Sequence, residues 1–311
     1  MKNSAKNNRI PVIIDVDTGI DDAVALSIAL ACKKLDVRLV TVASGNVDLA
    51  QGAKNSLNIL HLFKHDNVPV AMGEKTKFVY NGFRHHSEDG IGGADPFFPK
   101  HNLKPIEANA TEAMADVINN AEQKVVIVAI GPLTNIDLLF KKHPEVKEKI
   151  QKLVIMAGSI EVYAPGEMPY FGFNVKINPK ACENVINSGV DILISPCDMG
   201  HIAKLTWQEV YKTKTTNMAG KIFEEIFRRY HDHHVKDGIA MHDSCAVASV
   251  IDPTLFKIEK LYVHMEYYDG NGVLRCEWKE PRNIDVCTDV DIKRFKKLYF
   301  KSLKKTKTVV D

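Results

Sequence analysis

Apolar runs alternate with amphipathic stretches along most of the chain, in the order of strands followed by helices. The apolar runs are short and rich in β-branched residues, which is typical of buried strands, and the longer stretches have a helical period. Strands that alternate with helices predict a mostly parallel sheet with right-handed crossovers. The expected fold is an α/β, doubly wound domain that covers residues 1–311. We expect strands near 10–14, 37–43, 68–72, 125–130, 153–157 and 191–195, and helices near 23–30, 49–63, 111–121, 133–140 and 180–187, with two or more within 207–251.

The pattern changes toward the C-terminus. Residues 261–267 and 272–278 read as antiparallel strands on either side of the sequence Asp269-Gly270-Asn271-Gly272, which is a hairpin signal. A Lys-rich helix near 290–303 follows, and we interpret its lysines as a solvated face. We therefore expect a small C-terminal antiparallel addition to the parallel sheet.

The strand and helix at residues 9–29 hold four carboxylates, Asp15, Asp17, Asp21 and Asp22, around Gly19. Gly19 is expected to supply a positive φ to the turn, and Asp21 and Asp22 fall in the first turn of the helix, where negative charge suits the dipole. One Asp could serve as a cap, but four close carboxylates repel one another and need a neutralising charge. An all-oxygen ligand set favours Ca²⁺ or Mg²⁺ over Zn²⁺. A hard-metal site is the expected result.

Other polar groups follow the predicted strands at the same sheet edge, where parallel sheets bind their ligands. They include Asn46, the backbone at Ile130-Gly131 and the backbone at Ala157-Gly158. A further carboxylate lies in Met241-His242-Asp243, at the start of an apolar helical run. Such a His-Asp pair is a weak signal by itself and is more often structural, but Asp243 is a candidate to complete the metal site that Asp17 and Asp22 begin.

Composition narrows the class of protein. The chain has 311 residues, 45% hydrophobic and 26% charged, with a net charge of +2, so nothing favours nucleic acid as a partner. Its six cysteines form no CxxC pair, the first residues lack the apolar core of a signal peptide, and no apolar stretch is long enough to span a bilayer. We expect reduced thiols and a cytoplasmic protein without a membrane partner.

Six motifs are spread along almost the whole chain: DVDTGIDDA (15–23), SGN (44–46), HHSEDGIGG (85–93), GPLTN (131–135), FNVKINPKA (173–181) and MHDSCAVA (241–248). In their order and spacing they resemble one family, the nucleoside hydrolases of inosine-uridine preferring type. The resemblance implies a Rossmann-like fold, calcium-dependent hydrolysis of the N-glycosidic bond of ribonucleosides, and a homodimer or homotetramer with a small-molecule nucleoside substrate.

The resemblance also implies roles for single residues. One Ca²⁺ would be held by Asp17, Asp22, Asp243 and the carbonyl of Ile130, and Asp17 would also be the general base for a calcium-bound water. The ribose hydroxyls would be held by Asp21, Asn46 and Asn174. The catalytic residues would be Asp17, Asn46 and His242. His242 would assist the departing base, His86 would belong to a lid over the substrate, and Asp15 would support the site without ligating the metal.

The chemistry fits these residues. Cleavage of an N-glycosidic bond builds positive charge on the ribosyl ring, as in glycoside hydrolysis, and a carboxylate-lined pocket stabilises that charge. Calcium acidifies water less than zinc does, so an adjacent carboxylate base is required.

The sequence departs from the family at the sugar end. Gly172 stands where the family commonly has a Glu that holds the 5′ side, the upstream Gly-Asn reads Gly166-Glu167, and Ser244 replaces a Pro. Either Glu167 substitutes from a shifted loop, or sugar recognition differs.

Several other interpretations remain open. Asp15 and Asp17 also fit a phosphatase with a DxD nucleophile, and loss of turnover would leave a nucleoside-binding protein. A zinc site would use His85, His231, His233 and His234. Trp207 and Trp278 are expected to pack, whereas Phe227 and Tyr230 either stack on a base or pack in the core.

Overall fold

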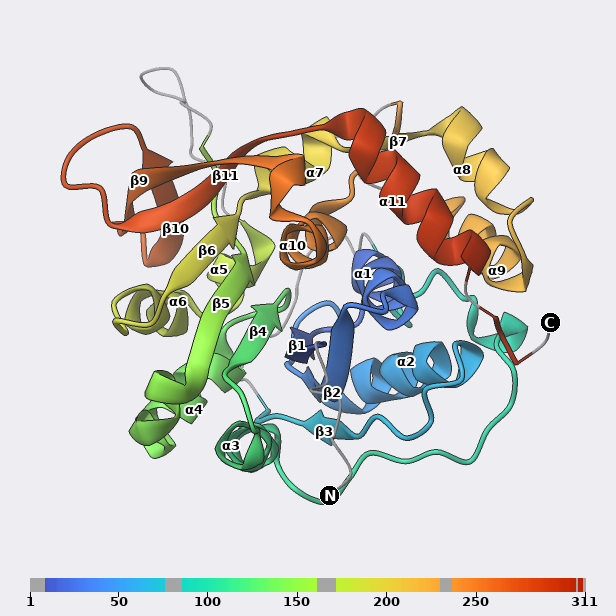
Figure 1. The fold of residues 1–311 in the computed structure, drawn as a ribbon, viewed down its shortest axis with the longest axis horizontal. Coiled ribbons are helices and arrows are strands. Elements are labelled where there is room, and N and C mark those ends of the chain that lie inside the picture. The colour runs from blue at the N-terminus through green and yellow to red at the C-terminus, as the bar shows by residue number, and fades with distance from the viewer. Residues whose placement is uncertain (1–8, 76–85, 161–171, 230–236, 306, 310–311) are drawn as a thin grey trace, which may run out of the picture.

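One nine-stranded sheet runs through the computed structural model (Figure 1), which describes residues 9–75, 86–160, 172–229, 237–305 and 307–309. The strand order is β10-β9-β11-β6-β5-β4-β1-β2-β3. Neighbouring strands from β3 to β11 pair in parallel, and β9 and β10 are antiparallel. The strands are β1 (Ile10–Val16), β2 (Leu35–Val42), β3 (Val70–Met72), β4 (Val125–Ala129), β5 (Ile150–Met156), β6 (Ile192–Ser195), β9 (Phe256–Tyr268), β10 (Asn271–Glu277) and β11 (Ile284–Val290).

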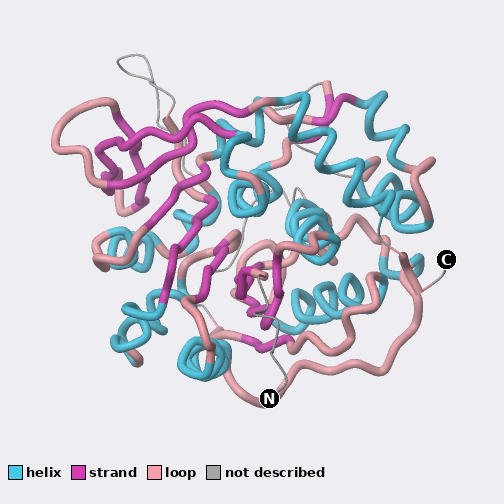
Figure 2. The backbone as a smooth tube through the Cα atoms, in the orientation of Figure 1, coloured by secondary structure: helices cyan, strands magenta, loops and turns pink. Residues whose placement is uncertain are grey.

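Helices cover both faces of this sheet, which confirms the doubly wound prediction (Figure 2). The core on one face includes buried residues of α1 (Ile20–Ala31), α2 (Leu49–Leu62), α7 (Cys197–Ile202), α8 (Trp207–Thr213), α9 (Met218–Phe227), α10 (His242–Ile251) and α11 (Ile292–Lys305). The other face packs against α3 (Ala110–Asn120), α4 (Thr134–Lys142), α5 (Phe173–Ile177) and α6 (Pro179–Ile186). Within the described ranges, no helix has both the length and the apolar composition of a membrane span.

The central strand β1 shows why its sequence is continuously apolar. Val12, Ile14 and Val16 enter the core beneath α1, and Ile13 enters the core on the α3 and α4 side. A strand covered on both faces has no solvated side, so it reads as an unbroken apolar run.

The C-terminal region both confirms and extends the sequence prediction. The hairpin turns at Asp269 (φ 47°) and Gly270 (φ 80°), as a two-residue loop with positive φ requires. The expected antiparallel addition is continuous with the main sheet, because β11 pairs in parallel with β6 and antiparallel with β9. In α11, Phe295, Tyr299 and Leu303 are buried and most of the lysines are exposed, as a solvated face predicts.

The order of the strands creates a switch point between β1 and β4. The chain leaves β1 for β2 and β3 on one side and then returns to place β4 on the other side of β1. In open α/β sheets the crevice outside the carboxyl ends of the strands at this point is where ligands bind. Asp17 follows β1 and Ile130 follows β4, so both lie at this crevice. The smaller elements are β7 (Leu205–Thr206), antiparallel to β8 (Gly238–Ile239), and 3-10 turns at Asp95–Phe97, Pro144–Lys149 and Pro253–Leu255.

Candidate active site

Two helix N-termini bring the acidic residues together at the switch point. Helix α1 begins at Ile20, so Asp21 and Asp22 lie in its first turn, and α10 begins at His242, so Asp243 lies in the first turn of that helix. One carboxylate oxygen from each of Asp21, Asp22 and Asp243 lies within 4.8 Å of the others. Residues more than 200 positions apart in sequence therefore form one acidic cluster.

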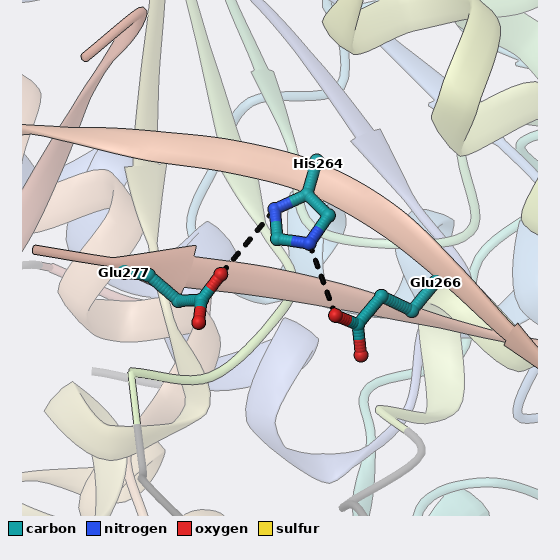
Figure 3. A group of neighbouring side chains, drawn as sticks. All are labelled: His264, Glu266 and Glu277. Carbon is teal, nitrogen blue, oxygen red and sulfur yellow. Dashed lines mark hydrogen bonds and ion pairs between the residues drawn. The ribbon is translucent and has the colours of Figure 1, made fainter. Parts of the chain in front are cut away.

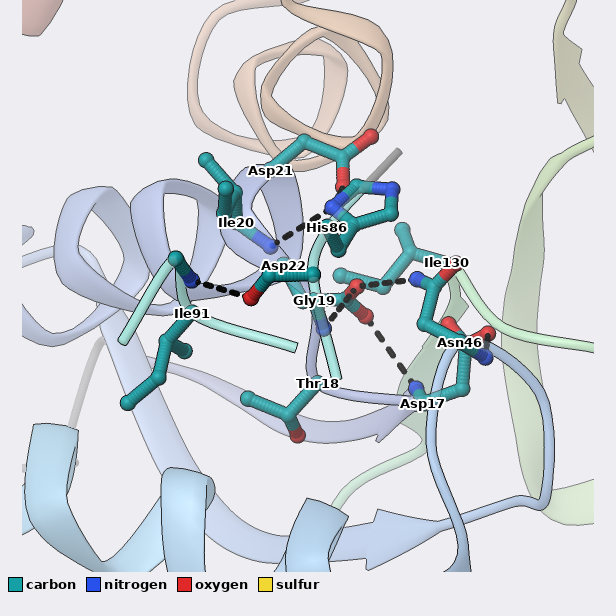
Figure 4. A network of polar contacts seen from close by, with 12 residues as sticks. Asp17, Thr18, Gly19, Ile20, Asp21, Asp22, Asn46, His86, Ile91 and Ile130 are labelled. Atoms are coloured by element: carbon teal, nitrogen blue, oxygen red, sulfur yellow. Dashed lines mark hydrogen bonds and ion pairs between the residues drawn. The ribbon is translucent and has the colours of Figure 1, made fainter. Parts of the chain in front are cut away.

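Asp17 joins this cluster through the backbone of the turn. The Asn46 amide donates to Asp17 Oδ2 at 2.7 Å, and the amide of Asp17 donates to Asp22 Oδ1 at 3.1 Å (Figure 4). The Gly19 amide donates to Asp22 Oδ2 at 2.9 Å. These bonds fix the direction of both carboxylates, and Asp17 is only 1% exposed.

Backbone donors do not neutralise the cluster. Burial, followed by the charge of Asp22, raises the pKa of Asp17 well above its usual range. Burial and the charge of Asp21 raise the pKa of Asp22 to about 7, and burial with the charges of Asp21, Asp22 and Asp17 raises that of Asp243. Asp21 Oδ1 is buried and has no hydrogen-bond partner among the described residues. A hard cation fits this donor set, because it would satisfy the unpaired oxygen and offset the repulsion.

Gly19 corrects one sequence expectation. Its φ is −89°, so the turn does not use the positive φ that the sequence suggested. The reason for glycine is space: a Cβ at this position would lie 2.6 Å from Asn46 Nδ2 and 2.8 Å from His86 Nδ1. The prediction was wrong because a glycine in a sequence does not show whether conformation or close approach requires it.

His86 lies over the start of α1. Its Nδ1 accepts a hydrogen bond from the Ile20 amide at 3.0 Å and is 3.8 Å from Asp21 Oδ1. The side chains of His86 and Asp21 are each 12% exposed. The structure thus places His86 beside the acidic cluster; its role in a lid over the substrate stays a prediction.

Asn55 of α2 connects the His86 loop to the turn after β1, and the sequence analysis missed it. Its Nδ2 donates to the carbonyl of Thr18 at 3.0 Å and to the carbonyl of Asp89 at 2.8 Å. Asp89 Oδ1 in turn accepts from the amides of Ile91 and Gly93. A buried amide in α2 was the sequence feature behind this link, and nothing in the local pattern distinguishes it from the neighbouring buried Ser56 and Asn58.

Asn174 lies beside Ile130, at the ends of β4 and β5. Its Nδ2 donates to the Ile130 carbonyl at 2.7 Å and to the Met156 carbonyl at 3.1 Å. A carbonyl oxygen has two lone pairs, so the Ile130 oxygen keeps one for a cation. Glu167 lies outside the described residues.

His242 is held at the first position of α10. Its Nδ1 is 3.1 Å from the Cys197 carbonyl, which can only accept, so Nδ1 carries the hydrogen of that bond. The ring also contacts the His201 ring, with centroids 4.9 Å apart.

Asp15 points to the opposite face of the sheet from α1. Asp15 Oδ1 accepts from Thr41 Oγ1 at 2.6 Å and from Asn135 Nδ2, in the GPLTN motif, at 2.8 Å. Burial raises the pKa of Asp15 to about 7. These bonds tie β1, β2 and α4 together beneath the acidic cluster.

A second group with metal-ligand side chains lies on the β9–β10 hairpin and was not found in the sequence (Figure 3). His264 Nε2 is 3.1 Å from Glu266 Oε1, and His264 Nδ1 is 3.6 Å from Glu277 Oε2. The two carboxylates therefore face different nitrogens of one ring. Arg275 and Lys279 already pair with Glu266 and Glu277, at 3.0 and 2.6 Å. We interpret this group as a neutralised network of ion pairs, because Arg275 and Lys279 already balance the charges of its two carboxylates.

Some remaining sequence interpretations can be decided. Phe227 is fully buried and stacks at 6.2 Å on Phe223, so it belongs to the core. Trp207 packs partly against the core, and Trp278 is half exposed. Tyr230 and the histidines of the zinc interpretation (85, 231, 233 and 234) lie outside the described residues.

The mostly parallel sheet with an acidic cluster at its switch point has the architecture that the motifs implied. Residues 12–297 match the family described as inosine-uridine preferring nucleoside hydrolase. The chain belongs to this family, whose members hydrolyse the N-glycosidic bond of ribonucleosides.

Individual relatives agree with this assignment. The non-specific ribonucleoside hydrolase RihC of Escherichia coli (strain SMS-3-5 / SECEC) is 35% identical over 297 residues, 92% of this chain and 96% of RihC. RihC of Klebsiella pneumoniae is 34% identical, and the match covers 93% of this chain and 96% of that protein. Among solved structures, the purine-preferring ribonucleoside hydrolase from Gardnerella vaginalis superposes with a TM-score of 0.85 at 26% identity, over 94% of this chain and 98% of that one. The plant nucleoside hydrolase PpNRh1 superposes with a TM-score of 0.85 at 25% identity, over 95% of this chain and 99% of that one. Family membership rules out the DxD phosphatase.

Proposed function

We propose that this enzyme is a calcium-dependent ribonucleoside hydrolase that releases free base and ribose from purine nucleosides, pyrimidine nucleosides or both. The observation that carries the proposal is the acidic cluster, in which Asp17, Asp22 and Asp243 are buried and the partly exposed Asp21 has a buried Oδ1 without a hydrogen-bond partner among the described residues. Asp17, Asp22, Asp243 and the Ile130 carbonyl would hold the cation. When bound, calcium supplies the charge that offsets the carboxylates and orients water and the ribose diol.

The chain's own residues divide the remaining work. Asp17, aligned by the Asn46 amide, takes a proton from the attacking water while the oxygen of that water bonds to C1′ of the ribose. Asp21, Asn46 and Asn174 hold the 2′ and 3′ hydroxyls. The bond from C1′ to the base nitrogen breaks with its electron pair going to the base. His242, protonated on both ring nitrogens, keeps the Nδ1 hydrogen on the Cys197 carbonyl and supplies the Nε2 proton to the departing base. His86 closes the site over α1 and limits the entry of bulk water.

The calcium-bound protein should be more stable than the metal-free protein. Saturation at 100 times the dissociation constant adds about 2.7 kcal/mol to the free energy of unfolding, which is roughly a 5 °C rise in Tm. Differential scanning calorimetry of chelated protein with and without calcium measures this rise. Magnesium should give a smaller rise, because it sheds its waters reluctantly. Asp22→Asn should abolish the calcium effect, and an unchanged Tm of the wild-type protein in saturating calcium at pH 8 would contradict the metal assignment.

The calcium effect should also depend on pH. The pKa of Asp22 is about 7 in the folded state, against about 3.9 in an unfolded chain, so the metal-free fold retains a proton that the unfolded chain loses. Metal-free stability therefore falls as the pH rises from about 4 to about 7. Calcium must displace this proton, so the rise in Tm should be larger at pH 8 than at pH 5.5.

The sugar end of the pocket should tolerate loss of the 5′-hydroxyl. Gly172 precedes α5, and a Cβ built there meets no atom of the described residues closer than 3.8 Å, so among these residues the position is open as well as uncharged. A pocket that hydrogen-bonds a hydroxyl rejects an analogue lacking it by as much as about 10⁴-fold, since its polar groups are left unpaired. With Gly172 the penalty in kcat/KM for a 5′-deoxynucleoside should be small, whereas 2′- and 3′-deoxy analogues should lose much more.

If Glu167 recognises the 5′-hydroxyl in place of the family's Glu, the same assay gives a different result. A 5′-deoxy penalty above about 10³-fold, or roughly 4 kcal/mol, would show that another group recognises the 5′ side. Glu167→Gln should then remove most of that penalty. If the small penalty is unchanged in Glu167→Gln, the open 5′ side is supported.

We also propose that residues 1–311 form a single domain that acts in the cytoplasm as a homodimer or homotetramer. The six cysteines are all free, which is consistent with a reducing compartment. The net charge of +2 gives no support to a nucleic-acid partner.

A further inference from the structure

The short helix α7 holds the first turn of α10 through its backbone. The Met241 amide donates to the Gly200 carbonyl at 3.1 Å, and Cys245 Sγ lies 3.6 Å from the Met199 carbonyl. Between these contacts, the Cys197 carbonyl accepts from His242 Nδ1 at 3.1 Å. Three successive contacts thus place α7 alongside the imidazole of His242.

Gly200 supplies the space in which that imidazole lies. A Cβ at Gly200 would be 2.2 Å from His242 Nδ1, 2.6 Å from Cγ and 2.7 Å from Cα. The Cα belongs to the backbone, so rotation of the His242 side chain could not relieve the overlap. The imidazole therefore packs directly against the backbone of α7.

His201 borders the same ring from the next position of α7. The two ring centroids are 4.9 Å apart and the planes meet at 76°, an edge-to-face contact of the kind that aromatic rings favour. The Cys197 carbonyl fixes where Nδ1 points, and the His201 ring limits how the imidazole plane can tilt. Together they leave His242 little rotational freedom.

We propose that His201 is a positioning residue that acts through His242, and that its ring packing sets the orientation in which His242 assists the departing base. The inference rests on the proposed role of His242. Misplacement of a catalytic group by about 1 Å can cost 10²-fold in rate, so a packing neighbour can control turnover without touching the substrate. The effect is confined to substrates whose base is a poor leaving group.

The test compares inosine with p-nitrophenyl riboside, whose leaving group departs without protonation. His201→Ala should lower kcat/KM for inosine by roughly 10- to 100-fold and change that for p-nitrophenyl riboside by less than about 3-fold. His201→Phe keeps a ring at this position and should restore most of the inosine rate. His143→Ala, a partly exposed histidine on the far side of the sheet that pairs with Glu112, is the matched control and should leave both substrates unaffected.

A double-mutant cycle separates positioning from general destabilisation. His201→Ala added to His242→Ala should cause no further loss on inosine, because the residue acts through His242. Additive losses, equal losses on both substrates, or a Phe variant as slow as the Ala variant would overturn the inference. If His242→Ala itself slows both substrates equally, the proposed role of His242 fails instead, so the two failures are distinguishable.

Discussion

Asp17→Asn should lower kcat for every ribonucleoside by about 10⁴-fold or more. The amide keeps the size of the carboxylate and an oxygen that can accept from the Asn46 amide, but it cannot take a proton and brings no charge to a cation. Loss of a general base alone lowers the rate by up to about 10⁴-fold, and weaker binding of the cation adds several kcal/mol to the activation barrier. Steady-state kinetics with inosine and uridine measure the loss.

Folding should survive this change. Asp17 is buried beside Asp22 and Asp21, whose charges raise its pKa, so removing the charge relieves repulsion in the metal-free protein. The matched control is Asp116→Asn, an exposed carboxylate on α3 that bonds only to Asn120 among the described contacts, and its rate should stay within about 2-fold of wild type. An Asp17→Asn enzyme with more than a tenth of wild-type kcat would show that Asp17 is not the base.

His242→Ala should slow the hydrolysis of inosine by roughly 10²- to 10⁴-fold, the range that general acid catalysis contributes. The bond from Nδ1 to the Cys197 carbonyl keeps one ring nitrogen engaged with the protein, which leaves Nε2 as the nitrogen for the base. p-Nitrophenyl riboside should be much less affected, because its leaving group needs no proton. If both substrates lose equally, His242 has a role other than assistance of the leaving group.

The fold was predictable where burial leaves a direct mark on the sequence. Strand β1 is covered on both faces and is therefore a continuous apolar run, and the Asp269-Gly270 turn requires residues that accept positive φ. Strand β11 was missed because IDVCTDV mixes polar with apolar residues. Helix α7 was missed because six residues are too short to show a helical period.

The candidate site was only partly predictable, because some of its residues lie far apart along the sequence. The carboxylates of residues 15–22 indicated a cation site by themselves; Asp17, Asp21 and Asp22 do lie in the acidic cluster, whereas Asp15 bonds to Thr41 and Asn135 on the opposite face of the sheet. No spacing rule joins Asp243 to them, because five strands of the main sheet, β2 to β6, are built in between. The sequence alone therefore offered Asp243 only as a candidate, and the family resemblance gave it a role. Asn55 and His201 act through tertiary contacts that no local pattern encodes.

The most direct test measures ribose released as reducing sugar from inosine and uridine by the purified protein, first chelated and then with calcium returned. We expect release of base and ribose in equal amounts by the untreated enzyme, almost none after exhaustive chelation, and recovery when calcium is added back. Ribose release at the full rate from exhaustively chelated protein would contradict the calcium-dependent mechanism, and no release from either nucleoside under any of these conditions would contradict ribonucleoside hydrolysis itself.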